Sequence, residues 1–237
     1  MKLMHYLDRF CLLENPQIHL WNLNSLLYLQ VVKLVLDKNP KQILDNDFAQ
    51  IKNEFSEKSP NIILCSKSFL KSEFLNRLID SHANPVIFLD FDLLYSGYVI
   101  SGLIKKNENV KIFRSSRLNW EKDLKEIIKK ISREKVLVIL DSLNVVYNMF
   151  DEIESARFIN AAIMLLSTIA RHTKSQIVVT AMAIKNDDGE WILSPSGRHL
   201  IDSKKSGVYY LGMSETSLIL NSIDKRQQYD KSFEIKK

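Results

Sequence analysis

Lys71 and Ser72 are the first residues in the chain whose types and spacing suggest phosphate chemistry. They follow a strand-like apolar run, where the pattern G-x-x-x-x-G-K-[ST] places its lysine and its hydroxyl residue. Cys65 and Leu70 occupy the two glycine positions. Glycine lets successive backbone N–H groups turn inward around phosphate oxygens, in conformations that a Cβ atom disfavours. We therefore expect a strand–loop–helix unit with a damaged phosphate cradle. Lys71 and Ser72 are then either vestigial nucleotide-binding residues or simple helix-surface residues.

Carboxylates end two other apolar runs. Asp141 closes the run 136–140, and in a working NTPase an aspartate at the carboxyl end of a central strand holds magnesium. Asp90 and Asp92 follow the run 86–89, and a carboxylate there could orient an attacking water. The alternative for this pair is a helix N-cap beside a solvated side chain. Asp92 and Asp141 are thus vestigial catalytic candidates. No metal site is expected, except at Asp141 if magnesium is retained.

A long polar loop follows the apolar run 177–179, and long loops at the carboxyl ends of strands often carry function. Its aromatic and basic residues could stack a base and hold backbone phosphates. The loop could equally bind a protein, or be pinned by a half-buried tryptophan. The candidate nucleic-acid-binding residues are Lys185, Trp191, Arg198, Lys204 and Lys205.

The net charge of +5 is concentrated in residues 105–135, which carry eleven Lys or Arg against five Asp or Glu. A basic segment can bind nucleic acid. It can also be the solvated face of an amphipathic helix, because its basic residues recur every three or four positions. That series is Lys122, Lys125, Lys129 and Arg133.

The elements that must position these residues alternate between strand and helix. Short apolar runs at 62–64, 86–89, 110–113, 136–140 and 177–179 read as buried parallel strands. Helix-length segments lie between them, at 71–82, 94–106, 119–133 and 153–172. A hairpin over 208–223 and a last strand at 232–235 follow. The predicted fold class is therefore α/β, with three αβα layers, a mostly parallel sheet and a C-terminal antiparallel extension.

The composition is that of a globular protein. Hydrophobic residues make up 46% and charged residues 26% of the 237 residues, and no apolar run is long enough to span a membrane. Cys11 and Cys65 have no metal-ligand spacing, which predicts reduced thiols in a cytoplasmic protein. We expect an N-terminal helical segment over 1–44 and one core domain over 45–237.

The ordered series of these segments resembles the RecA/RadA recombinase-like ATPases, especially archaeal RadA paralogues and KaiC-like proteins. The resemblance covers about 45–237 and places 65–72 on Walker A, 87–92 on the strand of the catalytic acid and 136–142 on Walker B. Residues 178–180 fall on the strand before the second DNA-binding loop, and 195–200 on the stretch after it. The resemblance implies a RecA-like core that packs beside similar cores.

The departures from the family pattern fall in several segments. Both glycines of the phosphate loop are missing, Asp92 replaces a glutamate, and Ala181 and Met182 replace a polar pair that senses the γ-phosphate. We therefore expect a non-catalytic RecA-like paralogue that serves as a binding and assembly module in DNA recombination or repair. The expected partners are a RadA-type recombinase, copies of the chain itself, or single-stranded DNA, and no cofactor is expected.

Two alternatives remain open. The first is a slow ATPase that binds ATP and Mg²⁺ on a non-standard loop through Lys71, Ser72, Asp92 and Asp141. The second is an RNA-binding or tRNA-binding ring subunit, because the Elongator accessory subunits also resemble RecA cores without intact Walker motifs.

Overall fold

The computed structural model describes residues 44–149, 153–194, 198–199 and 204–236. The predicted helical segment 1–44 lies outside these residues except for Leu44, where α3 begins. The boundary between this segment and the core therefore stays a prediction. Within the described part of the chain, no helix is long and apolar enough to cross a bilayer.

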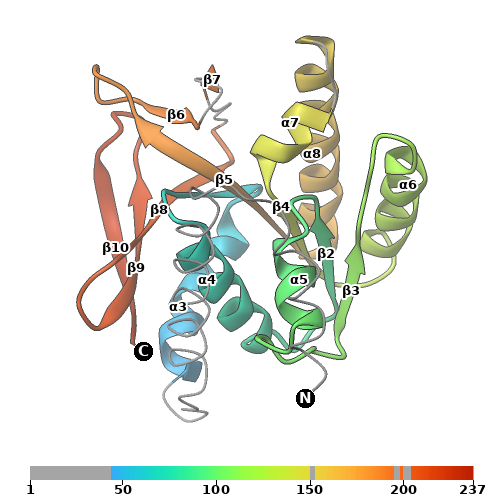
Figure 1. Cartoon of the computed structure of the whole chain (residues 1–237), viewed down its shortest axis with the longest axis horizontal. Helices are drawn as coiled ribbons and strands as arrows, with labels where there is room; N and C mark the ends of the chain where they lie inside the picture. The colour runs from blue at the N-terminus through green and yellow to red at the C-terminus, as the bar shows by residue number, and fades with distance from the viewer. Residues whose placement is uncertain (1–43, 150–152, 195–197, 200–203, 237) are drawn as a thin grey trace, which may run out of the picture. The chain divides into compact units, whose positions relative to one another are not determined.

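The described strands form one sheet with a mostly parallel centre (Figure 1). Its parallel part runs in the order β8-β1-β5-β4-β2-β3, so β5 lies between β1 and β4. The bounds are β1 (Asn61–Cys65), β2 (Val86–Asp90), β3 (Val110–Phe113), β4 (Leu137–Asp141), β5 (Gln176–Lys185) and β8 (Gly207–Met213). Every residue of β1, β2 and β4 is buried, which explains their continuous apolar runs: a strand covered on both faces has no polar side to alternate with.

Helices cover both faces of this sheet (Figure 1). One face is covered by α3 (Leu44–Glu57), α4 (Ser68–Asp80) and α5 (Leu94–Ile100). Phe48 of α3 contacts Phe74 of α4, and Tyr95 of α5 stacks on Phe88 of β2. On the other face pack α6 (Trp120–Ile131), α7 (Leu143–Met149) and α8 (Ile153–Thr173). The three layers predicted from the alternation of runs are thus confirmed.

The C-terminal extension is antiparallel, as predicted. β9 (Ser217–Ile223) pairs with β8, and β10 (Tyr229–Lys236) pairs with β9. A second antiparallel ribbon consists of the end of β5, β6 (Trp191–Leu193) and β7 (Arg198–His199). The predicted fold class is confirmed in its architecture, which is α/β with a mostly parallel sheet between two layers of helices and antiparallel C-terminal strands.

Element bounds differ from the predictions at several ends. The helix predicted over 71–82 begins three residues earlier, at Ser68, and the helix predicted over 94–106 ends at Ile100. Gly102 then takes a positive φ of 74°, a conformation that side chains with a Cβ rarely adopt. The last strand begins at Tyr229 rather than at 232, because its pairing with β9 continues past a register shift.

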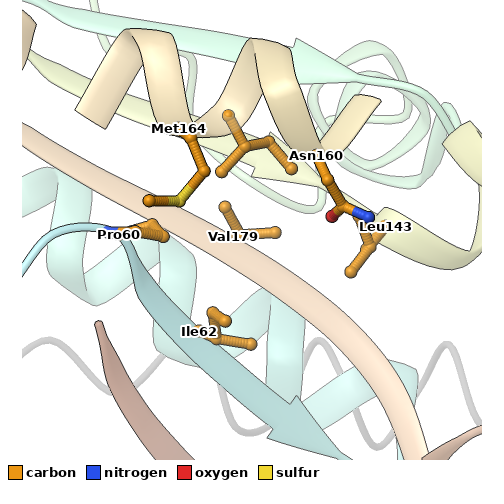
Figure 2. Close-up of a pocket in the computed structure, with 7 residues that line it drawn as sticks. Pro60, Ile62, Leu143, Asn160, Met164 and Val179 are labelled. Carbon is orange, nitrogen blue, oxygen red and sulfur yellow. The ribbon is translucent and has the colours of Figure 1, made fainter. Parts of the chain in front are cut away.

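A small hollow lies between α8 and the strands β1 and β5 (Figure 2). Figure 2 shows Pro60 and Ile62 on one side and Met164 and Asn160 of α8 on the other, with Val179 between them. Its volume is about 30 Å³. That volume suits about one water molecule, so this hollow is no site for a nucleotide or an organic cofactor.

Candidate functional site

The connection between β1 and α4 has only two residues, Ser66 and Lys67. β1 ends at Cys65 and α4 begins at Ser68, with Lys67 in extended conformation as its N-cap. The N–H of Lys71 donates to the carbonyl oxygen of Lys67 at 3.3 Å, as in a helix. Leu70, at the second glycine position of the pattern, is therefore helical and is 4% exposed. Most of the segment where a phosphate loop would lie is the first turn of a helix.

Lys71 meets both predicted acidic residues. Its side chain is 1% exposed, and its Nζ lies 2.5 Å from Asp92 Oδ2 and 2.6 Å from Asp141 Oδ1. The topology explains the meeting: β2 and β4 are adjacent parallel strands with Asp90 opposite Asp141, and carboxyl ends of parallel strands meet at one edge. The sequence thus identified three residues that the fold brings together.

Hydrogen bonds hold all three carboxylates of this edge. Thr180 Oγ1 donates to Asp141 Oδ1 from the neighbouring strand β5. Asp92 Oδ1 accepts from the N–H of Leu94 at 3.0 Å, and Asp90 Oδ2 accepts from the N–H of Ser96 at 2.6 Å. Both aspartates therefore bind amides at the start of α5, but the N-cap residue is Leu93 and Asp90 is 0% exposed, so the alternative of an N-cap beside a solvated side chain does not describe this pair.

Burial and ion pairing shift the pKa values at this edge in opposite directions. Burial raises the pKa of Asp141 to about 6, although Lys71 opposes the shift. Burial also raises the pKa of Asp90 above its ordinary value, against the hydrogen bonds from Ser96. Burial alone would lower the pKa of Lys71, but Asp141 and Asp92 raise it above its ordinary value. The two carboxyl groups that Lys71 bonds therefore stabilise its charged form in a buried position.

Three carboxylates close together could ligate a cation. One oxygen each of Asp90, Asp92 and Asp141 lie within 4.8 Å of one another. Asp90 Oδ1 and Asp141 Oδ2 are buried and have no hydrogen-bond partner among the described residues. The ammonium of Lys71 already bonds two of the three side chains, so it supplies the positive charge that a divalent cation would otherwise bring.

Among the described residues, no hydrogen bond joins the side chain of Ser72 to Lys71, Asp92 or Asp141. Ser72 is 3% exposed, and its hydroxyl donates to the carbonyl oxygen of Ser68 at 3.2 Å. Serine in a helix commonly bonds the carbonyl one turn back in this way. Ser72 is therefore a buried helix residue, and its predicted nucleotide contact stays a prediction.

Asn144 is a site residue that the sequence reading did not identify. Its Nδ2 donates to the carbonyl oxygens of Met182 at 2.9 Å and Ser194 at 2.5 Å, and its Oδ1 accepts from the N–H of Met182 at 2.7 Å. It thereby ties the start of α7 to the turn from β5 into β6. The available signal was an amide side chain three residues after Asp141, which ends the apolar run.

The five predicted nucleic-acid-binding residues do not form one surface. Lys185 pairs in register with Trp191, and the backbone of Arg198 lies beside β6. Along the direction of β1, Lys205 lies beside Ser59, two residues before the strand begins. Lys185 lies three residues beyond Met182, which is paired with Cys65 at the end of β1. At about 3.3 Å per residue the two positions are on the order of 30 Å apart. Lys204 and Lys205 therefore lie at the opposite edge of the sheet.

Trp191 packs in the core and does not stand open for a base. It is 7% exposed, and its ring stacks on Tyr210 with centroids 4.6 Å apart. Tyr210 stacks in turn on Tyr229, at 6.3 Å, and the Nζ of Lys185 lies 5.4 Å from the Trp191 ring centroid. The alternative of a loop pinned by its tryptophan is therefore the better description of Trp191.

Comparisons with known proteins found similarity among solved structures. No family model matches the chain, and no curated protein matches its sequence. A structure titled "The Structure Of A DnaB-Like Replicative Helicase And Its Interactions With Primase" is similar at 10% sequence identity, with a TM-score of 0.48. The match covers 76% of this chain and 54% of the helicase chain, so this chain spans about half the length of that protein.

Proposed function

We propose that this chain is a RecA-like core that does not hydrolyse ATP and acts as a binding and assembly module. The observation that carries the proposal is the buried ammonium of Lys71, which bonds Asp92 and Asp141 at 2.5 and 2.6 Å. In this role Lys71 is a counter-ion that stabilises the fold, and it does not contact a phosphate.

The short β1–α4 connection supports the same proposal. A phosphate loop works through several backbone N–H groups that converge on the phosphate oxygens. Here two residues connect strand and helix, neither is glycine, and Leu70 is buried where such a loop would have its second glycine. The residues at this position therefore do not fit Mg²⁺ or ATP, and we assign no catalytic step to either ligand.

The intact sheet supports the binding role. A mostly parallel sheet with both faces covered leaves its surface helices and its antiparallel extension available for partners. The proposed partners are a RadA-type recombinase or a second copy of the chain, within DNA recombination or repair. A subunit of an RNA-binding ring is the alternative of the same class.

A slow ATPase is the second candidate function. One observation favours it: Lys71, Asp92 and Asp141 still meet at the carboxyl edge of the sheet, beside the start of α4. If the chain were an ATPase, Lys71 would exchange Asp92 and Asp141 for a phosphate. That exchange would require the first turn of α4 to rearrange.

An ATP hydrolysis assay separates the two candidates. We expect no phosphate release above that of a buffer blank, with or without oligonucleotide. Asp141→Asn is the matched control because an amide keeps the size of the carboxylate and removes its charge. Turnover that the native chain shows and Asp141→Asn lacks would establish the ATPase and refute the proposal.

A further inference from the structure

The exposed face of α6 carries a row of cations along most of the helix. Lys122, Lys125 and Lys129 are exposed, and the exposed Arg133 lies two residues after the helix end. At about 1.5 Å per residue this row spans about 16 Å along the helix axis. Arg117, also exposed, extends it past the N-terminal end.

Three of the four cations of this row on α6 and just after it are not neutralised by an ion pair among the described residues. Lys125 lies 3.9 Å from Glu121, but both side chains are 80% exposed, and an ion pair so exposed contributes little. Among the described residues, Lys122, Lys129 and Arg133 have no ion-pair partner within 4 Å. Glu126, on the same helix, is paired with Lys111 of β3. The row is therefore a surface of net positive charge.

The loop before α6 presents an apolar side chain at the end of this row. Leu118 is 98% exposed, and with Arg117, Glu121, Lys122 and Lys125 it lines an open groove of about 450 Å³. A leucine so exposed contributes almost nothing to the stability of the folded chain. It is available for contact with a partner.

This loop is held in one conformation. Ser116 donates its hydroxyl to Asn119 Oδ1 at 2.8 Å, and Ser115 donates its hydroxyl to Asp123 Oδ2 at 2.7 Å. Trp120, at the start of α6, is 1% exposed and stacks at a tilt on Phe91. The groove is therefore formed before any partner binds, which lowers the entropy lost on binding.

We propose that the α6 face and the Arg117–Leu118 loop bind the phosphate backbone of a single-stranded nucleic acid. This inference rests on the proposed function in one respect, since it names the partner of the binding module. Charge complementarity argues for it: a nucleic acid strand carries one negative charge per about 3.4 Å, so a row of five cations can face several phosphates. Leu118 offers an apolar contact to a base at the end of the row.

The surface predicted around Lys185 is less suitable for this partner. The turn between Lys185 and Trp191 contains three acidic residues, Asp187, Asp188 and Glu190. α6 lies beside β3 at one end of the sheet, and β8–β10 lie at the other end (Figure 1), so the two surfaces are separate and can be tested separately.

Fluorescence anisotropy of a labelled oligothymidylate strand tests the proposal with the full chain. Five phosphate contacts give a slope of log affinity against log salt of about −3.5, so the affinity falls roughly a hundredfold between about 50 and about 200 mM salt. Lys122→Ala combined with Lys129→Ala should reduce the slope by about 1.4 and the affinity at least about tenfold at low salt. The matched control, Lys225→Ala with Arg226→Ala in the exposed turn between β9 and β10, should change neither.

A second variant probes the apolar contact. Leu118→Ser should lower the affinity a few fold and leave the salt slope unchanged, because it removes no charge. Circular dichroism confirms that each variant is folded, which is expected since all the changed side chains are exposed.

Three results would overturn the inference. They are no binding of the strand at low salt, an equal loss of affinity in the α6 double variant and in the control double variant, and binding to anionic lipid vesicles in place of the strand. Each of them leaves the ATP hydrolysis result unaffected, so failure of the partner assignment and failure of the proposed function are distinguishable.

Discussion

Replacing Lys71 by methionine should destabilise the fold strongly. Methionine keeps the length of the apolar stem and removes the ammonium that lies between Asp92 and Asp141. Asp141 is 1% exposed and would be left as an unpaired buried carboxylate, which typically costs about 3–5 kcal/mol. Asp92 is 20% exposed, so water screens part of its charge, and we expect a value near the lower end of that range.

Urea unfolding measures this loss directly, and thermal unfolding gives a second readout. For a domain of this size each kcal/mol shifts Tm by about 2–4 °C, so we expect Tm to fall by roughly 6–16 °C. Lys129→Met is the matched control: this lysine is exposed, and its loss should change the free energy of unfolding by less than about 0.5 kcal/mol.

The loss should depend on pH in a direction set by Asp141. The pKa of this carboxyl is raised to about 6 in the folded chain, against an ordinary value near 3.8. The folded state thus holds the proton more tightly, and this contribution to stability decreases as pH rises from about 4 through about 6. Without Lys71 the folded pKa rises further. The difference between variant and native chain should therefore be smaller at pH 5 than at pH 8.

Adding Asp141→Asn to Lys71→Met should recover part of the lost stability, because the double variant buries no unpaired charge at this position. Lys71→Met with a free energy of unfolding within about 0.5 kcal/mol of the native value would refute the counter-ion role. So would a loss that the second substitution does not reduce.

Three further predictions concern residues around the site. His82 is 9% exposed, and burial lowers its pKa to about 4. The free energy of unfolding of the native chain should therefore fall by up to about 3 kcal/mol between pH 6.5 and pH 4, because the unfolded state takes up the proton first. Urea unfolding of His82→Gln at the two pH values should lack this decrease. Asn144→Ala should lower the free energy of unfolding by about 2–4 kcal/mol and speed hydrogen exchange at the Met182 amide, which loses its acceptor. Unchanged exchange at this amide would argue against the hydrogen bond between Asn144 and Met182. Trp191→Ala should cost about 3–5 kcal/mol as a core residue does, whereas a tryptophan at an open loop tip would cost little.

The parallel core could be predicted because its strands are buried on both faces. Continuous apolar runs such as 86–89 and 136–140 leave no polar face, and the helix-length segments between them permit only crossover connections. The same topology made the meeting of Lys71, Asp92 and Asp141 predictable, since it depends only on which residues follow which strands.

What could not be predicted depends on contacts between distant segments. Whether Trp191 is open or buried depends on Tyr210, which lies on a strand reached only after the long loop. The start of α4 at Ser68 depends on the local sequence. With no glycine to stop it, the helix extends back to within two residues of the end of β1. The role of Asn144 depends on backbone groups of Met182 and Ser194, which its neighbours in sequence do not indicate.

Calorimetric titration of the chain with Mg–ATP shows directly whether nucleotide displaces Lys71 from its carboxylates, on which the proposed function depends. The structure predicts no heat of binding at concentrations up to the millimolar range, for the native chain and for Asp141→Asn alike. Saturable binding in the micromolar range by the native chain, lost in Asp141→Asn, would contradict the account and establish a nucleotide site.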